Sequence, residues 1–419
     1  MTAEPANRIL HVPRRFSLDE WGGTEAVITN LCEAQLAAGF RPEIHTSLAL
    51  ARKKTEHYRN IPIHRYAYCY PFLGLNVADR LQLDKKGGNL LSWPLYRALR
   101  CAKGVRLYHA HVTKRTGASV WKAARINQRP CVVTLHGNIF DVPQVEADDV
   151  VAPQEGKFEW GRIFGAYFGS RRMLDEVDAV LCVGFSEYEK AAQLLGQERV
   201  HFLPNGVHPE RLICGPNERE DCRRQLGFGE NAFIFGCISR LDPQKDQLSL
   251  IDAFSELAVA DADLGLVLCG PQTNAAYVRQ LEQRAAASPA AARIRILPAV
   301  EPETPAHRSL FAALDCFVLP SRHEPFGIVV LEAWSAGKPV IAAKVGGLAR
   351  LLQHELTGLH FESGHAPALA TAMARMRQDG SLRASTVRCA QAEVQRHYTW
   401  QGVARQLESI YQQVESKYR

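Results

Sequence analysis

Both halves of this 419-residue sequence alternate short apolar segments with longer amphipathic ones. In the first half, RILHVP at residues 8–13 has the length and composition of a buried strand, and residues 25–38 carry apolar side chains at helical spacing before Gly39. Further strand candidates are residues 43–48, 105–112, 131–136, 179–184 and 200–204, followed in the second half by FIFGCIS, LGLVLCG, RIRILP, CFVLPS and KPVIAA. Strands that alternate with helices form parallel sheets covered by helices on both faces. The sequence therefore predicts an α/β fold with two doubly wound sheets.

A chain of this length is too long for one ordinary core, so we expect two domains. The boundary is placed near Asn205 and Gly206, before the loosely patterned segment VHPERLICGPNERE. The first domain is then residues 1–205, the second is residues 206–395, and residues 396–419 form a C-terminal helix. No apolar run reaches the roughly 18 residues of a membrane span, and the eleven cysteines are scattered without a C-x-x-C pair. These features favour a cytoplasmic protein with reduced thiols.

Positive charge is concentrated in the first half. Residues 41–130 contain 18 basic and 4 acidic side chains, a local charge of +14. Such a face suits an anionic membrane leaflet, a pyrophosphate-bearing acceptor or an acidic glycan, and would hold the protein at the inner face of the cytoplasmic membrane. A solvated face without a specific partner explains the charge equally well. Nucleic acid is not expected, because aromatic side chains are not interleaved with the basic ones.

The most informative local pattern is HEPFGIVVLEAWSAG at residues 323–337. It follows the apolar strand CFVLPS, and its own apolar run predicts a helix, with Glu324 in the preceding loop and Glu332 about two turns into the helix. The helix start would offer unpaired backbone N–H groups to an anion at Phe326, Gly327 and Ile328. Two carboxylates with an anion site between them suit a ligand with hydroxyl groups, a diphosphate and a ribose, which describes a nucleotide sugar. Acidic residues also favour helix starts for structural reasons, so the spacing alone leaves that alternative open.

Other residues that could bind a ligand or take part in catalysis also come directly after predicted strands. They are Gly22 and Gly23 after the first strand, His111 and His136 after two others, and Arg240 and Lys245 after FIFGCIS. Ligands of doubly wound sheets bind beyond the carboxyl ends of the strands, so we expect these residues to line one crevice between the two halves. The structural alternatives are a plain turn for the glycines, a surface cation pair for Arg240 and Lys245, and a backbone-bonded side chain for His136.

A metal site is a weaker hypothesis. His109 and His111 lie two residues apart on one predicted strand, so their side chains share a face and could bind a metal. No cluster of carboxylates or cysteines accompanies them in the sequence. We therefore expect neither a metal nor another cofactor.

Taken together, these segments resemble the retaining glycosyltransferases of family 4, which have the two-domain GT-B fold. The resemblance extends over nearly the whole chain. It rests on WGGTEAVITNLCEAQLAAG, YHAH, TLHG, LPNGV, SRLDPQKD, HEPFGIVVLEAWSAGKPVIAAKVGGL and the closing YTWQGVARQLESIY. It implies two Rossmann-like domains that face an inter-domain cleft, with the acceptor in the first domain, the nucleotide sugar in the second, and a C-terminal helix that returns to the first.

The resemblance also implies roles for single residues. Glu324 would contact hydroxyls of the donor sugar, Glu332 would bind the ribose, and Arg240 and Lys245 would neutralise the diphosphate as it leaves, without a metal. Backbone amides would hold the diphosphate at Phe326, Gly327 and Ile328. His136 would orient the transferred sugar, and the absence of a Cβ would let the backbone approach phosphate or acceptor closely at Gly22 and Gly23.

The implied chemistry is front-side transfer, in which the departing diphosphate oxygen takes the proton of the acceptor. No separate nucleophile and base are then required. Glu324 and Glu332 are assigned to opposite ends of the donor, unlike the carboxylate pair of a glycosidase, which flanks one bond.

Two positions depart from the family pattern, and one segment is ambiguous. Asp246 stands where a glycine usually follows the lysine, and we expect its side chain to cap the following helix. Arg350 stands where a glutamate is usual after a glycine pair, and an added cation there makes the donor less certain. Residues 138–170 form a long acidic and then aromatic segment, either an acceptor-binding element or a packed surface helix.

These features lead us to expect a metal-independent hexosyltransferase that uses a UDP-sugar, with GDP-mannose as the second choice. Its acceptor would be a glycan or a lipid pyrophosphate in the biosynthesis of a polysaccharide, lipopolysaccharide or glycolipid. Two alternatives remain: transfer to a soluble acceptor such as a sugar phosphate, and a non-catalytic GT-B protein that binds glycans or partners.

Overall fold

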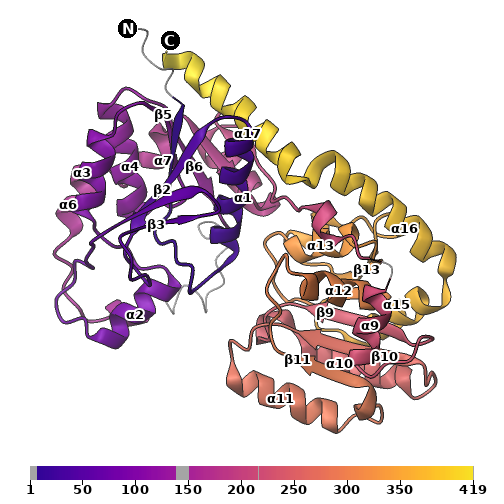
Figure 1. The fold of residues 1–419 in the computed structure, drawn as a ribbon. Coiled ribbons are helices and arrows are strands. Elements are labelled where there is room, and N and C mark those ends of the chain that lie inside the picture. Colours follow the sequence, from indigo (N-terminus) through magenta and orange to yellow (C-terminus); the bar gives the residue numbers. More distant parts are fainter. Residues whose placement is uncertain (1–6, 138–150, 216, 419) are drawn as a thin grey trace. The chain divides into compact units, whose positions relative to one another are not determined.

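A computed structural model describes residues 7–137, 151–215 and 217–418 (Figure 1). The chain forms two compact units, Met1–Pro204 with Val403–Arg419 and Asn205–Gly402, called the first and second domains below. The division falls between Pro204 and Asn205, one residue from the expected position.

An eight-stranded sheet is the centre of the first domain. Its strands run in the order β3-β4-β2-β1-β5-β6-β7-β8, and every neighbouring pair is parallel except β3 with β4. The strands are β1 (Arg8–Val12), β2 (Arg41–Ser47), β3 (Thr55–Tyr58), β4 (Ile61–Tyr66), β5 (Val105–Ala110), β6 (Cys131–Leu135), β7 (Ala179–Cys182) and β8 (Val200–Phe202). Strands β6 and β7 are buried along their whole length, as their continuous apolar sequences predict.

Helices cover this sheet (Figure 1). They are α1 (Gly23–Ala37), α2 (Val77–Lys86), α3 (Trp93–Cys101), α4 (Lys114–Ile126), α6 (Arg162–Phe168), α7 (Met173–Glu176) and α8 (Phe185–Leu195), with a 3-10 turn at Ala152–Gln154. The largest buried side chains of the core between β5, β6 and the helices α3 and α4 are Tyr96, Tyr108, Trp121 and Phe168.

The sequence patterns missed the hairpin of β3 and β4. Its two-residue turn is Arg59–Asn60, and both residues have positive φ, 48° and 64°. This backbone normally selects glycine, whose absence removed the usual hairpin signal. Strand β4 nevertheless alternates buried and half-buried side chains, and its inward Arg65 donates to the carbonyl oxygen of Phe16 at 2.9 Å.

The second domain contains a six-stranded parallel sheet in the order β11-β10-β9-β12-β13-β14. Its strands are β9 (Phe233–Ile238), β10 (Leu264–Cys269), β11 (Ile294–Leu297), β12 (Cys316–Leu319), β13 (Val340–Ala343) and β14 (Leu359–Phe361). The first strand of the domain, β9, lies between β10 and β12, so the order reverses at the β9–β12 junction. Doubly wound sheets bind ligands beyond the carboxyl ends of the strands at such a junction.

The helices of the second domain alternate with its strands along the chain, beginning with α9 before β9 and ending with α15 and α16 after β14 (Figure 1). They are α9 (Glu218–Gln225), α10 (Gln247–Ala258), α11 (Ala275–Ala286), α12 (Pro305–Ala313), α13 (Ile328–Ser335), α14 (Leu348–Leu351), α15 (Ala366–Gln378) and α16 (Gly380–Glu393), with 3-10 turns at Pro209–Leu212, Pro243–Lys245 and Ala291–Arg293 and a π-helix at Val394–Tyr398. Both domains are therefore α/β units, and their sheets are parallel apart from the β3–β4 pair, as the alternation of segments predicts.

The last described helix is α17 (Trp400–Glu415), and a 3-10 turn at Ser416–Tyr418 follows it. The chain belongs to the first domain again from Val403 onward, later than the boundary placed at residue 396. The buried side chains of α17 recur at helical spacing at Val403, Leu407, Ile410, Tyr411 and Val414. Arg106 of β5 forms ion pairs with Glu408 and Glu415 of this helix at 2.6 and 2.5 Å. In the described part of the chain, no helix combines the length and apolarity that crossing a membrane requires.

Candidate functional site

Three of the predicted residues follow the two strands at the reversal point of the second sheet. Arg240 and Lys245 lie in the loop after β9, and Glu324 lies in the loop after β12. The side chains of Lys245 and Glu324 meet, with Nζ 2.5 Å from Oε2 and only 13% and 12% of the side chains exposed. Arg240 lies on the same loop with 49% of its side chain exposed and donates to Gln244 at 3.1 Å. The fold thus brings together a cation and a carboxylate that are 79 residues apart in the sequence.

Two glycines, Gly346 and Gly347, pack closely against the backbone of the loop that carries Glu324. The N–H of Gly347 donates to the carbonyl oxygen of Glu324 at 2.8 Å. A Cβ at Gly346 would lie 2.5 Å from that oxygen, and a Cβ at Gly347 would lie 2.1 Å from the carbonyl oxygen of Pro325. Only residues without a Cβ permit this approach of two backbones. Arg350 is exposed on the short helix that follows.

Asp246 does not cap α10 in the expected way. It occupies the N-cap position, but its carboxylate accepts no hydrogen bond from a backbone N–H of that helix. Oδ2 instead accepts from the hydroxyl of Ser249 at 2.9 Å, and the carboxylate pairs with Arg322 at 3.2 Å. The φ of Asp246 is 51°, in the left-handed region, which explains why glycine is the usual residue here and why an aspartate is tolerated.

Glu332 lies closer to the start of α13 than expected, because the helix begins at Ile328 and Glu332 is only about one turn in. Its Oε2 is 4.0 Å from Nε2 of His307, whose side chain is 5% exposed. Burial raises the pKa of Glu332 to about 8, and the carboxylate of Glu303 adds to this shift. Burial also lowers the pKa of His307 to about 4, so the two facing groups are mainly neutral near pH 7. Nδ1 of His307 has no hydrogen-bond partner among the residues described.

The start of α13 has the geometry expected of a close backbone approach. Gly327 precedes the first helical residue, Ile328, with a φ of 97°, and a Cβ there would lie 2.6 Å from a methyl group of Leu348. Phe326 is 3% exposed, and its ring contacts that of Tyr398. Its side chain belongs to the core, so only its backbone is available to a ligand.

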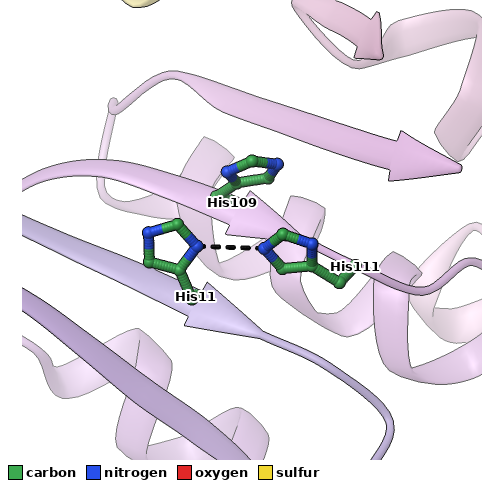
Figure 2. A group of neighbouring side chains, drawn as sticks. All are labelled: His11, His109 and His111. Carbon is green, nitrogen blue, oxygen red and sulfur yellow. Dashed lines mark hydrogen bonds between the residues drawn. The ribbon is translucent and has the colours of Figure 1, made fainter. Parts of the chain in front are cut away.

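In the first domain, His136 follows β6 and belongs to a group of four histidines. Its Nε2 lies 3.1 Å from Nδ1 of His111. Figure 2 shows the next contact, in which Nε2 of His111 lies 2.9 Å from Nδ1 of His11. Burial lowers the pKa of His136 and of His11 to about 4. His136 is thus hydrogen-bonded to a side chain, whereas the sequence suggested backbone as the alternative. Sequence reasoning missed His11, although β1 pairs with β5 in a register that sets it beside His109.

A buried glutamate supports the backbone beside His136. Oε2 of Glu187, on α8, accepts a hydrogen bond of 2.9 Å from the N–H of Gly137. Gly137 has a φ of 81°, so the chain leaves β6 through a left-handed turn. No local pattern in the sequence signals this contact, because the partners are 50 residues apart.

Nitrogen atoms of His11, His109 and His111 lie within 4.8 Å of one another, close enough to consider a metal (Figure 2). Each of their ring nitrogens already has a partner: Gln35 and His111 for His11, Tyr411 and Thr134 for His109, His11 and His136 for His111. The rings of His109 and His111 are stacked, with centroids 4.1 Å and planes 27° apart. An imidazole binds a metal through a ring-nitrogen lone pair, so ligation here would require these hydrogen bonds to break. The arrangement suits hydrogen bonding better than ligation.

A second group of possible metal ligands, Glu43, His45 and His64, lies on the neighbouring strands β2 and β4 of the same sheet. Glu43 forms a two-pronged pair with Arg8 at 2.8 and 2.7 Å, and His45 lies 3.1 Å from its Oε2. The pairing with Arg8 and His45 holds the pKa of Glu43 at about 2, against the opposing effect of burial. The carboxylate is thus committed to an ion pair.

Gly22 and Gly23 precede and begin α1. Gly22 has a φ of −145°, which any residue adopts, and its Cβ would lie 3.1 Å from Oε2 of Glu25. A Cβ at Gly23 would meet no atom of the described residues within 4 Å. The two glycines therefore leave open backbone at the helix start rather than relieving strain.

The acceptor segment predicted at residues 138–170 is only partly visible, since residues 138–150 lie outside the described residues. Its aromatic part forms α6, where Phe168 is buried and Phe164 packs against the core. Tyr167 is half exposed. Helix α6 therefore has the packed-helix character of the structural alternative, but Phe158 and Trp160 before it are exposed as well as Tyr167.

Comparisons with known proteins agree on one class of enzyme. The 27% identical mannosyltransferase of Corynebacterium glutamicum, described as GDP-mannose-dependent and acting on a monoacylated phosphatidylinositol monomannoside, aligns over 64% of this chain and 71% of its own length. The D-inositol 3-phosphate glycosyltransferase of Salinispora tropica is 34% identical over 237 residues, 53% of this chain. That alignment spans about half of the relative, 47%.

Solved structures match over almost the whole chain. A glycosyltransferase of Rickettsia africae has a TM-score of 0.73 at 18% identity and covers 97% of this chain and 98% of its own. HepE of Anabaena in complex with UDP has a TM-score of 0.70 at 23% identity, covering 97% and 100%. At these identities the likeness shows the fold.

Two family profiles match consecutive parts of the sequence. The one described as glycosyltransferase family 4 matches residues 21–211, and the one described as glycosyl transferases group 1 matches residues 218–393. Between them they include every predicted site residue. The chain belongs to the family 4 glycosyltransferases of group 1, and its two parallel-sheet domains have the GT-B fold.

Proposed function

We propose that this protein transfers a hexose-type sugar, with retention of its anomeric configuration, from a nucleotide sugar to a glycan or lipid-linked acceptor. The observation that carries the proposal is the pair of Lys245 and Glu324 at the reversal point of the second sheet, with Glu332 on the helix that follows. A carboxylate, a cation and a helix start on adjacent loops match the parts of a nucleotide sugar.

In this mechanism each group acts on one part of the donor. Glu324 accepts hydrogen bonds from hydroxyls of the sugar, and its partner Lys245 is placed to neutralise the diphosphate as it leaves. Arg240, on the same loop and half exposed, can move to add a second positive charge. Cations already in position stabilise charge that develops in the transition state. The departing oxygen then takes the proton of the acceptor on the face where the sugar bond breaks.

The proposed donor is a UDP-sugar, with GDP-mannose as the second candidate. Glu332 and the neighbouring His307 would bind the nucleoside part of either. A thermal-shift screen of UDP, GDP, ADP and their sugars tests this, because a bound nucleotide raises the apparent stability by mass action. If none of these compounds raises the unfolding temperature, the proposal is contradicted. Glu332→Ala should abolish any increase that is found.

Turnover and metal dependence are separate measurements. Transfer from the donor that binds should continue in the presence of EDTA, because Lys245 and Arg240 supply the positive charge. Loss of activity that Mg²⁺ or Mn²⁺ restores would contradict metal independence. Binding without transfer to any acceptor would favour the non-catalytic alternative.

For the acceptor we propose a lipid-linked molecule at a membrane surface. Exposed apolar side chains gather around α2, where Leu73, Val77 and Leu81 are 60%, 84% and 48% exposed. Phe158, 67% exposed, joins them, because its carbonyl oxygen accepts a hydrogen bond from the N–H of Leu73. The exposed basic side chain of Arg80 lies on the same helix, within the basic region 41–130. Apolar and basic side chains together suit the surface of an anionic bilayer.

Liposome flotation tests this surface. Vesicles that contain anionic lipid should bind the protein in a salt-sensitive way, and Val77→Asp with Leu81→Asp should weaken that binding. Leu194→Asp is the matched control, since Leu194 is 69% exposed on α8. Binding to no vesicle would contradict the membrane proposal and favour a soluble acceptor such as a sugar phosphate.

A further inference from the structure

A continuous line of hydrogen bonds runs from α1 to His136 in the first domain. Oε1 of Gln35 lies 2.8 Å from Nε2 of His11, and Nδ1 of His11 lies 2.9 Å from Nε2 of His111 (Figure 2). Nδ1 of His111 lies 3.1 Å from Nε2 of His136. Each histidine in this line uses one nitrogen toward each neighbour, so the line ends at Nδ1 of His136.

The three histidines are neutral near pH 7. Burial lowers the pKa of His11 and of His136 to about 4, and burial together with the neighbouring histidines lowers that of His111 well below its ordinary value. A neutral imidazole has one N–H, which donates, and one lone pair, which accepts. All the hydrogen bonds in the line must therefore run in the same direction, and one group at an end determines which.

Gln35 is that group. An amide oxygen only accepts and an amide nitrogen only donates, so Oε1 facing His11 requires the proton on Nε2 of His11. Nε2 of His111 then donates to His11, and Nε2 of His136 donates to His111. Nδ1 of His136 is left with a lone pair.

The other end of the same amide determines a second branch. Nε2 of Gln35 faces the hydroxyl of Tyr411 at 3.4 Å, and that hydroxyl lies 2.6 Å from Nδ1 of His109. The hydroxyl accepts from Gln35 and donates to His109, whose Nε2 then donates to Oγ1 of Thr134 at 2.6 Å. The amide orientation in the structure thus sets the direction of both branches. Turning the amide over would reverse both branches and place a proton on Nδ1 of His136.

We propose that Gln35 is a positioning residue that fixes His136 as the tautomer protonated on Nε2, so that Nδ1 accepts a hydrogen bond from a hydroxyl of the bound substrate. The strands β1 and β5, which carry His11 and lead to His111, flank the reversal point of the first sheet. Ligands bind at that end of such sheets. Identifying the hydroxyl as that of a sugar rests on the proposed function, whereas the tautomer does not.

Nuclear magnetic resonance of the full chain labelled with ¹⁵N-histidine tests the proposal, because long-range ¹H–¹⁵N correlations distinguish the two neutral tautomers. His136→Asn assigns its signals. The unliganded protein should show His136, His111 and His11 protonated on Nε2. A proton on Nδ1 of His136 would overturn the proposal.

The variant Gln35→Leu removes the group that determines the direction. We expect the signals of His136 to change to a mixture of tautomers or to the reversed one. Thr29→Val is the matched control, since Thr29 is buried on the same helix and its hydroxyl has no partner among the described residues. An unchanged His136 tautomer in folded Gln35→Leu would refute the role of Gln35. Gln35→Met serves the same purpose if the leucine variant does not fold.

The outcome is independent of whether sugar transfer is observed. Tautomers are read without a donor, while nucleotide binding to the second domain is measured by thermal shift. The expected tautomers without nucleotide binding would leave the Gln35 proposal standing and contradict the proposed function. Nucleotide binding together with the reversed tautomer would leave the proposed function standing and contradict the Gln35 proposal.

Discussion

Replacing Glu332 by glutamine should stabilise the unliganded protein, and increasingly so as pH rises. Burial raises the pKa of Glu332 from an ordinary value of 4.5 to about 8. The folded protein then holds this proton more tightly than the unfolded chain, so the free energy of unfolding falls as pH rises between these two values and levels off above them. One pKa unit corresponds to about 1.4 kcal/mol, which sets an upper limit of about 5 kcal/mol. Because 21% of the side chain is exposed, we expect about 1 to 3 kcal/mol.

Urea unfolding of the wild type and Glu332→Gln, at intervals from about pH 5 to about pH 9, measures this difference. The glutamine cannot ionise, so the free energy of unfolding of the variant should exceed that of the wild type by an amount that grows with pH and then becomes constant. Glu256→Gln is the control, because Glu256 is exposed on α10 of the same domain. An advantage of Glu332→Gln that stays constant or shrinks with rising pH would refute the reasoning.

Four further outcomes follow from the second domain. Lys245→Met should lower the free energy of unfolding by about 3 to 5 kcal/mol, because it leaves the nearly buried carboxylate of Glu324 unpaired. Adding Glu324→Gln should restore most of this loss in urea unfolding, and equal losses in the single and double variants would contradict the pairing. Glu324→Ala should mainly lower kcat and Glu332→Ala mainly weaken nucleotide binding in steady-state kinetics and calorimetry; unchanged values in both would overturn the assignment. Nucleotide affinity should rise from about pH 6 to about pH 9 as Glu332 loses its proton and can accept from the ribose, and Glu332→Gln should bind without this dependence. Gly347→Ala should lower transfer strongly, because its Cβ would displace the loop of Glu324, whereas Asp246→Gly should fold normally; the reverse order of severity would refute the backbone argument.

The sequence predicted most of the fold because buried parallel strands are short, apolar and bounded by polar loops. Strand β6, CVVTL, is buried at every position and was recognised from composition alone. The β3–β4 hairpin was missed because its strands are half exposed and its turn, Arg59–Asn60, adopts positive φ without a glycine. Local patterns identify an element only where its burial or its turn has a local signature.

The sequence predicted which residues belong to the candidate site but not which of them contact one another. Lys245 and Glu324 were both named from the sequence, but their ion pair depends on the adjacency of β9 and β12, which chain order does not reveal. Gln35 and His11 were not named, because a buried glutamine in a helix and a histidine within a strand have no distinctive local pattern. The capping role expected of Asp246 was wrong because the left-handed backbone there turns its carboxylate toward Arg322 and Ser249.

Because α17 belongs to the first domain, that domain is completed only after the second has been synthesised. The described strands of the first domain all leave the ribosome before the second domain, yet the face that receives Val403, Leu407 and Tyr411 stays uncovered until α17 emerges. At about 5 to 20 residues per second, the intervening segment takes about 10 to 40 s to translate. The hydrogen bonds of the histidine group are also incomplete until then, because the hydroxyl of Tyr411 connects Gln35 with His109. A chain that stalls before α17 would therefore present an unfinished first domain to chaperones and proteases, even though the missing segment follows the second domain in the sequence.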